Sequence, residues 1–414
     1  MKRDIKILLI SIFIILFSWN SGKTQNKVDV LVVGTIHNQH AVSNFTYNDV
    51  LKVLHTYKPD LICVEIRPED FRVKPYLREM MLATQYGDLN GIKVEPIDWY
   101  DDNNSDRVLR DSLSKQDYYI KLSALEDSLL KNDQEIQKLY KIYGEDIYKN
   151  TQLDIMFWNG KDYNNIVRLS YKISLEIYGD SPVNLHYLTR NRNMLHLIND
   201  AITRNNSQRV IVLTGGEHKS FFDDSLIVRQ NVRLMSIESL LPLNSYDNTE
   251  LLTNQLPGLY FQKDVSNELK EEFYSDMALP LVHGMGMDVF PLRITGNSIK
   301  EYKFIVDNWG KEIPNSAKVI YELGWYNFLT GNYDNAIKWF NKYIGELEAG
   351  KISKDEPFDK GITYSQIARC YDVEGKRDMA IEYYNKTKAE LHSKNQDMFI
   401  DYLVTPYLNE PFKR

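Results

Sequence analysis

Cysteine is scarce in this sequence of 414 residues, which contains only Cys63 and Cys370. Two thiols cannot build the disulfide framework of a small secreted domain or a zinc site with several cysteine ligands. Cys63 lies within the apolar run Leu61 to Val64, a setting typical of a buried and inert thiol. We therefore expect neither cysteine to carry chemistry.

Positive charge is also in short supply. The chain has 50 Lys and Arg residues against 57 Asp and Glu residues, which gives a formal net charge of -7. Proteins that bind nucleic acids in general need a basic face. The composition therefore argues against a nucleic-acid partner, although a local basic pocket remains compatible with it.

Long apolar runs are absent except near the N-terminus, where Ile7 to Phe17 follows a basic start and precedes a polar stretch. This pattern is typical of a secretory signal, and the run is shorter than the roughly 20 residues that a membrane span needs. We expect residues 1–25 to be a signal peptide cleaved near Thr24 and Gln25. The protein would then be periplasmic or secreted, and an uncleaved signal segment would be its only membrane anchor.

Residues 26–245 carry the pattern of an α/β domain. Short valine-, leucine- and isoleucine-rich runs alternate with amphipathic helical segments, which predicts a mostly parallel sheet flanked by helices. A polar, glycine-poor part at about 106–180 interrupts this pattern and predicts a helical insertion that contains a hairpin over 112–143. The expected strands are 28–33, 61–66, 92–97, 209–213 and 232–237, and the expected helices between them are 48–57, 78–86 and 191–204.

The C-terminal third, residues 313–414, repeats one pattern of small and aromatic residues. The matching positions are Gly324, Gly331, Ala336 and Phe340 in the first copy and Ala368, Gly375, Ala380 and Tyr384 in the second. This pattern resembles the tetratricopeptide repeat, a helix-turn-helix unit, and predicts an all-α repeat domain after a connector at 246–312. Such a domain forms either a groove for a peptide or protein partner or a packing module for the α/β domain.

Two histidines follow predicted strands in the same manner. His37 comes three residues after Gly34, and His218 comes three residues after Gly215. The carboxyl ends of parallel strands share one edge of a sheet, where ligands bind. Two imidazoles at that edge could bind a divalent metal or share acid-base work. His40 is a third candidate ligand if a helical turn places it beside His37.

Charged side chains accompany the two histidines. Glu65 ends the second strand and Asp98 ends the third, while Glu79 lies on the helix between them. Arg190 opens the helix before the late strand, where it could hold a carboxylate or a developing oxyanion. Glu217, directly before His218, is a candidate acid-base group or ligand, or alternatively a solvated turn residue.

Together these segments resemble the TraB/Tiki superfamily, which is linked to erythromycin-esterase-like and haem-binding ChaN-like proteins. The resemblance spans roughly 28–240 and leaves the helical insertion unmatched. It is carried by Val32 to His37, Pro59 to Ile66, Glu79 to Asp98, Arg190 with Asn191, and Gly215 to His218.

The resemblance implies a peptidase that uses a divalent metal. By that resemblance His37 and His218 would be metal ligands, Glu65 a ligand or the base that activates water, and Arg190 a substrate or transition-state clamp. Thr189 stands where the family usually has a glutamate, so the register of Arg190 against Arg192 stays open.

The sequence thus predicts an exported metal-dependent hydrolase that acts on a peptide or ester bond, with catalytic Glu65, Arg190 and Glu217. Two alternatives stay open. The same edge could hold a metal or haem without turnover, or the α/β domain could be degenerate and the repeats could act as an interaction scaffold.

Overall fold

The computed structural model describes residues 27–41, 43–100, 105–282, 296–351 and 360–414. Its centre is a sheet of five parallel strands in the order β3-β2-β4-β1-β5. This order confirms the predicted α/β class. The fourth strand along the chain lies between the first and the second. The strands are β1 (Val28–Thr35), β2 (Leu61–Val64), β3 (Lys93–Pro96), β4 (Arg209–Gly215) and β5 (Val232–Met235).

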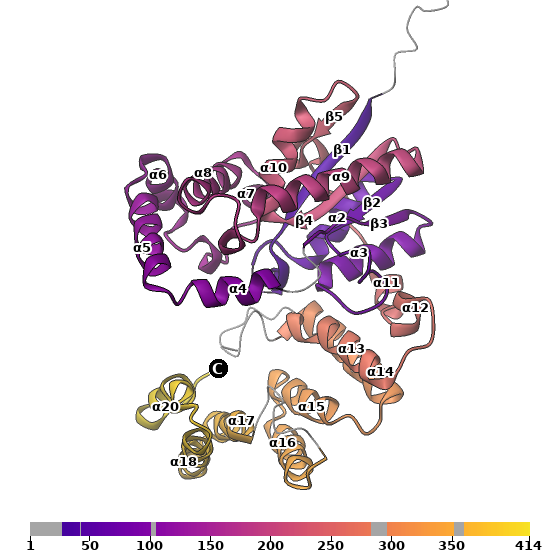
Figure 1. The fold of residues 1–414 in the computed structure, drawn as a ribbon. Coiled ribbons are helices and arrows are strands. Elements are labelled where there is room, and N and C mark those ends of the chain that lie inside the picture. The colour runs from indigo at the N-terminus through magenta and orange to yellow at the C-terminus, as the bar shows by residue number, and fades with distance from the viewer. Residues whose placement is uncertain (1–26, 42, 101–104, 283–295, 352–359) are drawn as a thin grey trace, which may run out of the picture.

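The central strands are buried on both faces, as their uninterrupted apolar runs require. Alternate side chains enter two separate cores, since successive residues of a strand point to opposite faces. Leu31 and Val33 join the core that also contains residues of α2 (Tyr47–Tyr57) and α3 (Arg78–Leu89). Val30 and Val32 join the core formed with α9 (Tyr187–Asn205) and α10 (Gly216–Ile227). Helices therefore cover both faces of the sheet (Figure 1).

Local sequence signals set the ends of α2. The Thr46 hydroxyl accepts a hydrogen bond from the Asp49 backbone N–H, and the Asp49 side chain accepts one from the Thr46 backbone, which forms a capping box. At the other end Lys58 adopts a left-handed conformation with φ 52°, directly before Pro59. The helix therefore stops where the sequence predicts and leads straight into β2.

The predicted insertion is helical, and the segment predicted as a hairpin forms the two helices α5 and α6, which are joined at Asp133. The insertion lies at one end of the sheet (Figure 1). Its contact with the domain runs mainly between α8 and α10. The helices are α4 (Ser105–Leu113), α5 (Asp117–Asn132), α6 (Gln134–Tyr143), η2 (Ile147–Lys149), α7 (Ile155–Trp158) and α8 (Lys161–Tyr178), followed by η3 (Pro182–Asn184).

The segment 246–312, interpreted above as a connector, is largely helical where it is described. The fully buried Arg78 of α3 donates to the Met277 carbonyl and pairs with Glu301, so this segment is fastened to the α/β domain. It begins after η4 (Ile237–Leu240) and contains α11 (Thr249–Thr253), α12 (Pro257–Phe261), α13 (Asn267–Val282) and α14 (Gly296–Glu312).

Two consecutive helix-turn-helix units follow, as predicted. Their turns contain Gly331 and Gly375 with φ of 79° and 75°, a conformation that favours glycine. A Cβ on Gly324 would lie 2.7 Å from the Phe340 ring, so the small residue permits close helix packing. The units are α15 (Ala317–Leu329) with α16 (Tyr333–Glu348), and α17 (Lys360–Val373) with α18 (Arg377–Ser393), ending in η5 (Asp397–Phe399), α19 (Ile400–Leu403) and α20 (Thr405–Asn409).

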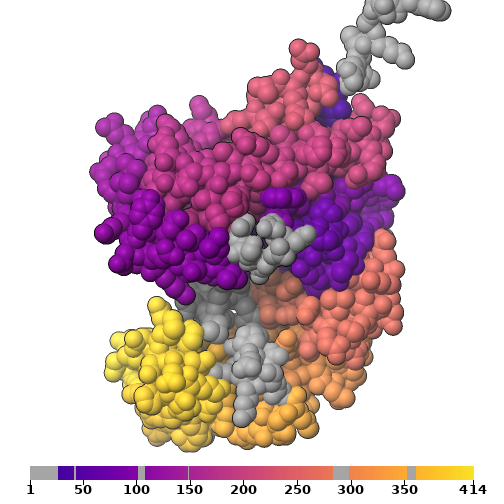
Figure 2. Space-filling model, viewed as in Figure 1, coloured from indigo at the N-terminus to yellow at the C-terminus, as the bar shows by residue number. Residues whose placement is uncertain are grey.

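The C-terminal helices form a second lobe beside the α/β domain (Figure 2). Both cysteines are free and buried, as expected for Cys63. Across the described ranges, none of the helices combines the length and apolar character needed to cross a membrane. The predicted signal peptide at 1–25 lies outside the described residues.

Candidate functional site

The carboxyl ends of β1, β2 and β4 bring four of the predicted site residues together. His37 follows β1, Glu65 follows β2, and His218 lies in the first turn of α10 after β4. Arg190 reaches the same place from the first turn of α9, with its terminal nitrogen 2.9 Å from the Glu65 carboxylate. The two turns that carry His37 and His218 therefore lie at the same edge of the sheet, as expected.

His37 is held by a carboxylate. It begins the 3₁₀ helix η1 (His37–Ala41) with a positive φ of 50°, and its Nδ1 lies 2.8 Å from Oε1 of Glu79. Burial alone would lower the pKa of His37, but the hydrogen bond and charge of Glu79, with Glu65 adding to them, raise it to about 9. The ring is therefore an imidazolium at neutral pH, and its side chain is 37% exposed.

His218 is held by a neutral amide. Its Nδ1 lies 2.9 Å from Oδ1 of Asn191, whose amide nitrogen donates to the Tyr187 carbonyl. An amide oxygen can only accept, so Nδ1 carries the proton and Nε2 carries the lone pair. Burial lowers the pKa of His218 to about 4 despite the nearby Glu65 charge. This ring is neutral at pH 7, and its side chain is 9% exposed.

Glu65 lies between the two histidines and has a partner on each oxygen. Oε2 accepts hydrogen bonds from the Thr214 hydroxyl, at 2.7 Å, and from the backbone N–H of Gly215, the N-cap residue of α10. Oε1 lies 2.9 Å from Arg190 and 3.5 Å from Nε2 of His218. Burial would raise the pKa of Glu65, but positive charge on His218 and Arg190 lowers it. Since His218 is neutral at pH 7 and His37 is charged, Arg190 and His37 are the cations that keep the carboxylate ionised.

Arg190 also resolves the register question raised by the sequence. Its Nε and terminal nitrogen lie 3.0 Å and 2.7 Å from Oδ1 of the fully buried Asp98, while Arg192 is exposed. The two carboxylates raise the pKa of Arg190 against the effect of burial, so its charge is permanent. Burial raises the pKa of Asp98, and Arg190 opposes that rise. Arg190 is thus clamped between two buried acids and is not an exposed substrate clamp.

Small residues allow the two histidine turns to approach each other. A Cβ on Gly34 would lie 2.9 Å from the Gly216 backbone, and a Cβ on Gly215 would lie 2.9 Å from Nε2 of His37. Nε2 of His37 therefore lies against the start of α10, close to Glu65. The Asn159 side chain binds both the N–H and the carbonyl of Gly34. No pattern in the sequence marked Asn159, because it lies 125 residues from Gly34 in the insertion.

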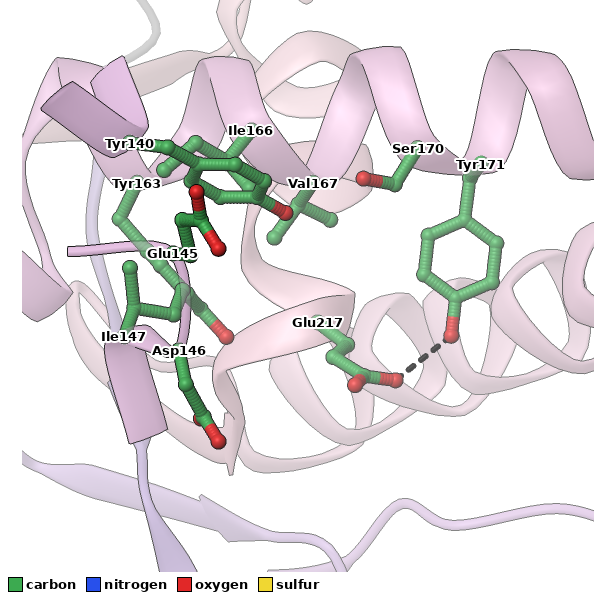
Figure 3. A pocket seen from close by; sticks show the side chains of 10 residues that line it. All are labelled: Tyr140, Glu145, Asp146, Ile147, Tyr163, Ile166, Val167, Ser170, Tyr171 and Glu217. Atoms are coloured by element: carbon green, nitrogen blue, oxygen red, sulfur yellow. Dashed lines mark hydrogen bonds between the residues drawn. The ribbon is translucent and has the colours of Figure 1, made fainter. Parts of the chain in front are cut away.

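The two remaining candidates have other partners. His40 is buried, with Nε2 accepting from the Ile36 backbone N–H and Nδ1 lying 2.7 Å from the Phe45 carbonyl. Both ring nitrogens are thus used by the backbone, so the arrangement does not support His40 as a third ligand. Glu217 accepts a hydrogen bond from the Tyr171 hydroxyl at 2.6 Å and lines a pocket beside the histidine edge (Figure 3).

The donors fit a divalent metal poorly as they are arranged. Among the residues that the structure describes, no three or more His, Cys, Asp or Glu side chains form a group that could hold a metal ion. Both oxygens of Glu65 already have partners, and a metal on Oε1 would lie beside the Arg190 guanidinium, where two positive charges repel. Metal binding stays a prediction, and no chemical step is derived from it below.

Asn191 and Glu79 are the residues whose roles the sequence left unassigned. Each anchors one imidazole through Nδ1, as supporting groups do for catalytic or metal-bound histidines. Their signal is positional only: Asn191 adjoins Arg190, and Glu79 opens α3. Comparison of the chain with protein-family models and with curated proteins finds no match. The TraB/Tiki resemblance therefore stays a prediction carried by the motifs alone.

Proposed function

We propose that this protein is a hydrolase of peptide or ester bonds in which His218 is the general base and His37 the general acid. The observation that carries the proposal is the opposite anchoring of the two rings, by an amide at His218 and by a carboxylate at His37. Environments that push two pKa values apart assign an acid and a base within one site. His218 is neutral and can take a proton, and His37 is charged and can give one.

The short approach between His218 and Glu65 supports the position of an attacking water. Nε2 of His218 and Oε1 of Glu65 lie 3.5 Å apart, and in the neutral tautomer both atoms are acceptors. Oε1 already accepts from Arg190 and can accept a second hydrogen bond, so one water can donate one hydrogen to Oε1 and the other to Nε2 of His218. Transfer of one of these protons to His218 would leave hydroxide to attack the carbonyl carbon of the substrate.

The two positively charged side chains at this edge, His37 and Arg190, would act in the later steps and in positioning. The imidazolium of His37 stabilises negative charge on the substrate carbonyl oxygen and gives its proton to the leaving group. Arg190 holds Glu65 ionised and in place, so its role is positioning. Glu65 orients the water, and Glu217 faces the adjoining pocket instead of the water.

The test is hydrolysis of a panel of p-nitrophenyl acyl esters and fluorogenic peptides by protein lacking residues 1–25. Removal of a general base costs about 10²–10⁴-fold in rate, so we expect His218→Gln and His37→Gln each to reduce kcat by that order while the fold is retained. The matched control is His40→Gln, which changes a histidine bound only to backbone groups. Rates that are equal in all three variants would overturn the proposal.

The same preparations decide between the proposal and its alternatives. Activity that disappears with a chelator and returns with a divalent cation would support the metal-dependent version implied by the resemblance. A haem absorption band that is lost in His37→Gln or His218→Gln, without hydrolysis, would favour a non-catalytic haem-binding protein. The proposed export, which rests on the N-terminal pattern, is tested by the N-terminal sequence of the protein recovered from the periplasm or medium.

A further inference from the structure

A pocket of about 410 Å³ adjoins the histidine edge. It lies between α6, the turn before η2, α8 and the first turn of α10, so the helical insertion provides nearly all of it (Figure 3). Its lining residues are Tyr140, Glu145, Asp146, Ile147, Tyr163, Ile166, Val167, Ser170, Tyr171 and Glu217.

Three consecutive residues join this pocket to the site. Gly215 lies against Nε2 of His37, the next residue Gly216 lies against the Tyr163 ring, and Glu217 is part of the pocket wall. Consecutive Cα atoms are about 3.8 Å apart, so the wall begins within about 8 Å of the contact with His37. A substrate whose side group filled the pocket would hold its neighbouring carbonyl near the two histidines.

The chemistry of the lining selects the group that fits. The walls are three tyrosine rings and three aliphatic side chains, which suit an apolar stem. The charged lining residues are all acidic: Glu145 and Glu217 are exposed, and Asp146 pairs with Lys149 at 2.9 Å. Figure 3 shows the carboxylates of Glu145 and Glu217 on opposite sides of the space. Tyrosine faces attract cations, and carboxylates attract them more strongly. An anionic group would meet like charge on each side.

We propose that this pocket binds a cationic group on an apolar stem, such as an alkylammonium or alkylguanidinium, and that the hydrolase prefers substrates with this group beside the scissile bond. This inference rests on the proposed function for its second part only. The binding of the cation itself depends on the pocket and not on catalysis.

Binding can be measured with two probes that cannot be hydrolysed, hexylammonium and hexan-1-ol, by ligand-observed NMR. We expect hexylammonium to bind at least about ten-fold more tightly than the neutral alcohol. Glu145→Gln should reduce the affinity for hexylammonium about ten-fold and leave the affinity for hexan-1-ol unchanged. The matched control is Glu135→Gln, an exposed carboxylate on α6 outside the pocket, which should change neither.

A second variant, Ser170→Trp, fills the pocket from α8 and should abolish binding of both probes. Equal affinity for the two probes, or an unchanged affinity for hexylammonium in Glu145→Gln, would overturn the inference. A kinetic arm compares kcat/KM for the p-nitrophenyl esters of N-acetyl-lysine and N-acetyl-norleucine. We expect a preference for lysine that Glu145→Gln reduces.

The two arms separate the inference from the proposed function. Hydrolysis with no preference between lysine and norleucine would overturn the pocket assignment and leave the acid-base site standing. Selective binding of hexylammonium without hydrolysis of any ester or peptide would overturn the proposed function and leave the cation pocket standing.

Discussion

The two glycine-x-x-histidine turns have the same spacing and lie at the same edge of the sheet, yet they place their imidazoles in opposite states. His37 leaves β1 in a left-handed conformation, is over a third exposed and has a carboxylate on Nδ1. His218 sits in the first turn of α10, is nearly buried and has an amide on Nδ1. One ring is charged at neutral pH and the other is neutral.

The difference teaches that the partner of the second ring nitrogen, more than the motif, decides what a histidine does. A carboxylate partner stabilises the imidazolium, and a buried amide leaves desolvation to favour the neutral ring. Two copies of one motif can therefore supply an acid and a base. Neither role can be assigned from the spacing, because both partners come from helices distant in sequence.

The largest effect on stability is expected from removing Arg190, the cation that contacts Glu65 beside His218. Arg190→Met leaves the buried carboxylates of Glu65 and Asp98 without their guanidinium. Breaking a buried ion pair by removing one partner costs about 3–5 kcal/mol, so we expect the free energy of unfolding to fall by that amount. Chemical denaturation measures it.

Arg192→Met is the matched control, because Arg192 lies two residues away on the same helix and is exposed. It should change the free energy of unfolding by less than about 0.5 kcal/mol. Equal effects of the two substitutions would show that Arg190 does not hold the buried carboxylates. The role of Arg190 as a positioning residue would then be wrong.

A smaller effect is expected from giving His37 the same kind of hydrogen-bond partner as His218, an amide in place of a carboxylate. Glu79→Gln gives His37 an amide partner in place of a carboxylate, and removal of an opposite charge shifts a pKa by about 1–3 units. We expect the pKa of His37 to fall from about 9 toward or below the ordinary histidine value. NMR titration of histidine-labelled protein measures the shift, and the pKa of His218 should rise slightly, because the charge on His37 that helps to lower it is lost. A His37 pKa that does not move would show that the carboxylate is not the cause of its protonation.

The smallest effect is expected in the pH dependence of stability, where the two histidines act on opposite sides of neutrality. An unfolded histidine titrates near pH 6.5. The raised pKa of His37 contributes stability that is fully present below pH 6.5 and is lost as the pH rises toward 9. The lowered pKa of His218 means that the unfolded chain binds a proton first, so stability falls as the pH drops below 6.5.

These two histidines therefore favour a stability maximum near pH 6.5, and His40, whose pKa burial also lowers to about 4, adds to the loss of stability on the acidic side. Denaturation between pH 5 and 9 should show that Glu79→Gln flattens the alkaline side and that His218→Gln makes the acidic side less steep. The range ends at pH 5 because Glu65 and Glu79, whose pKa values are lowered, lose their contributions at lower pH. A profile that both substitutions leave unchanged would contradict the opposite protonation states.

Much of the α/β frame was predictable because its signals are local. The run ending at Gly34, the helix start at Thr46 and the stop before Pro59 each depend on neighbouring residues only. The same holds for the helical repeat, where Gly331 and Gly375 mark the turns. The helices of 246–312 were not foreseen in full, since their packing partners, such as Arg78 for Glu301, lie over 200 residues away.

By itself the sequence determined that buried strands end in glycine-x-x-histidine turns, because burial pattern and chain reversal are properties of adjacent residues. The tertiary structure decided which groups reach those histidines. In the folded chain Glu79 contacts His37, and Asn191 contacts His218. Arg190 lies between two acids, and a pocket of the insertion adjoins the two histidine turns. The protonation state of a side chain depends on burial and on charges within a few ångströms, and these distances exist only in the folded chain.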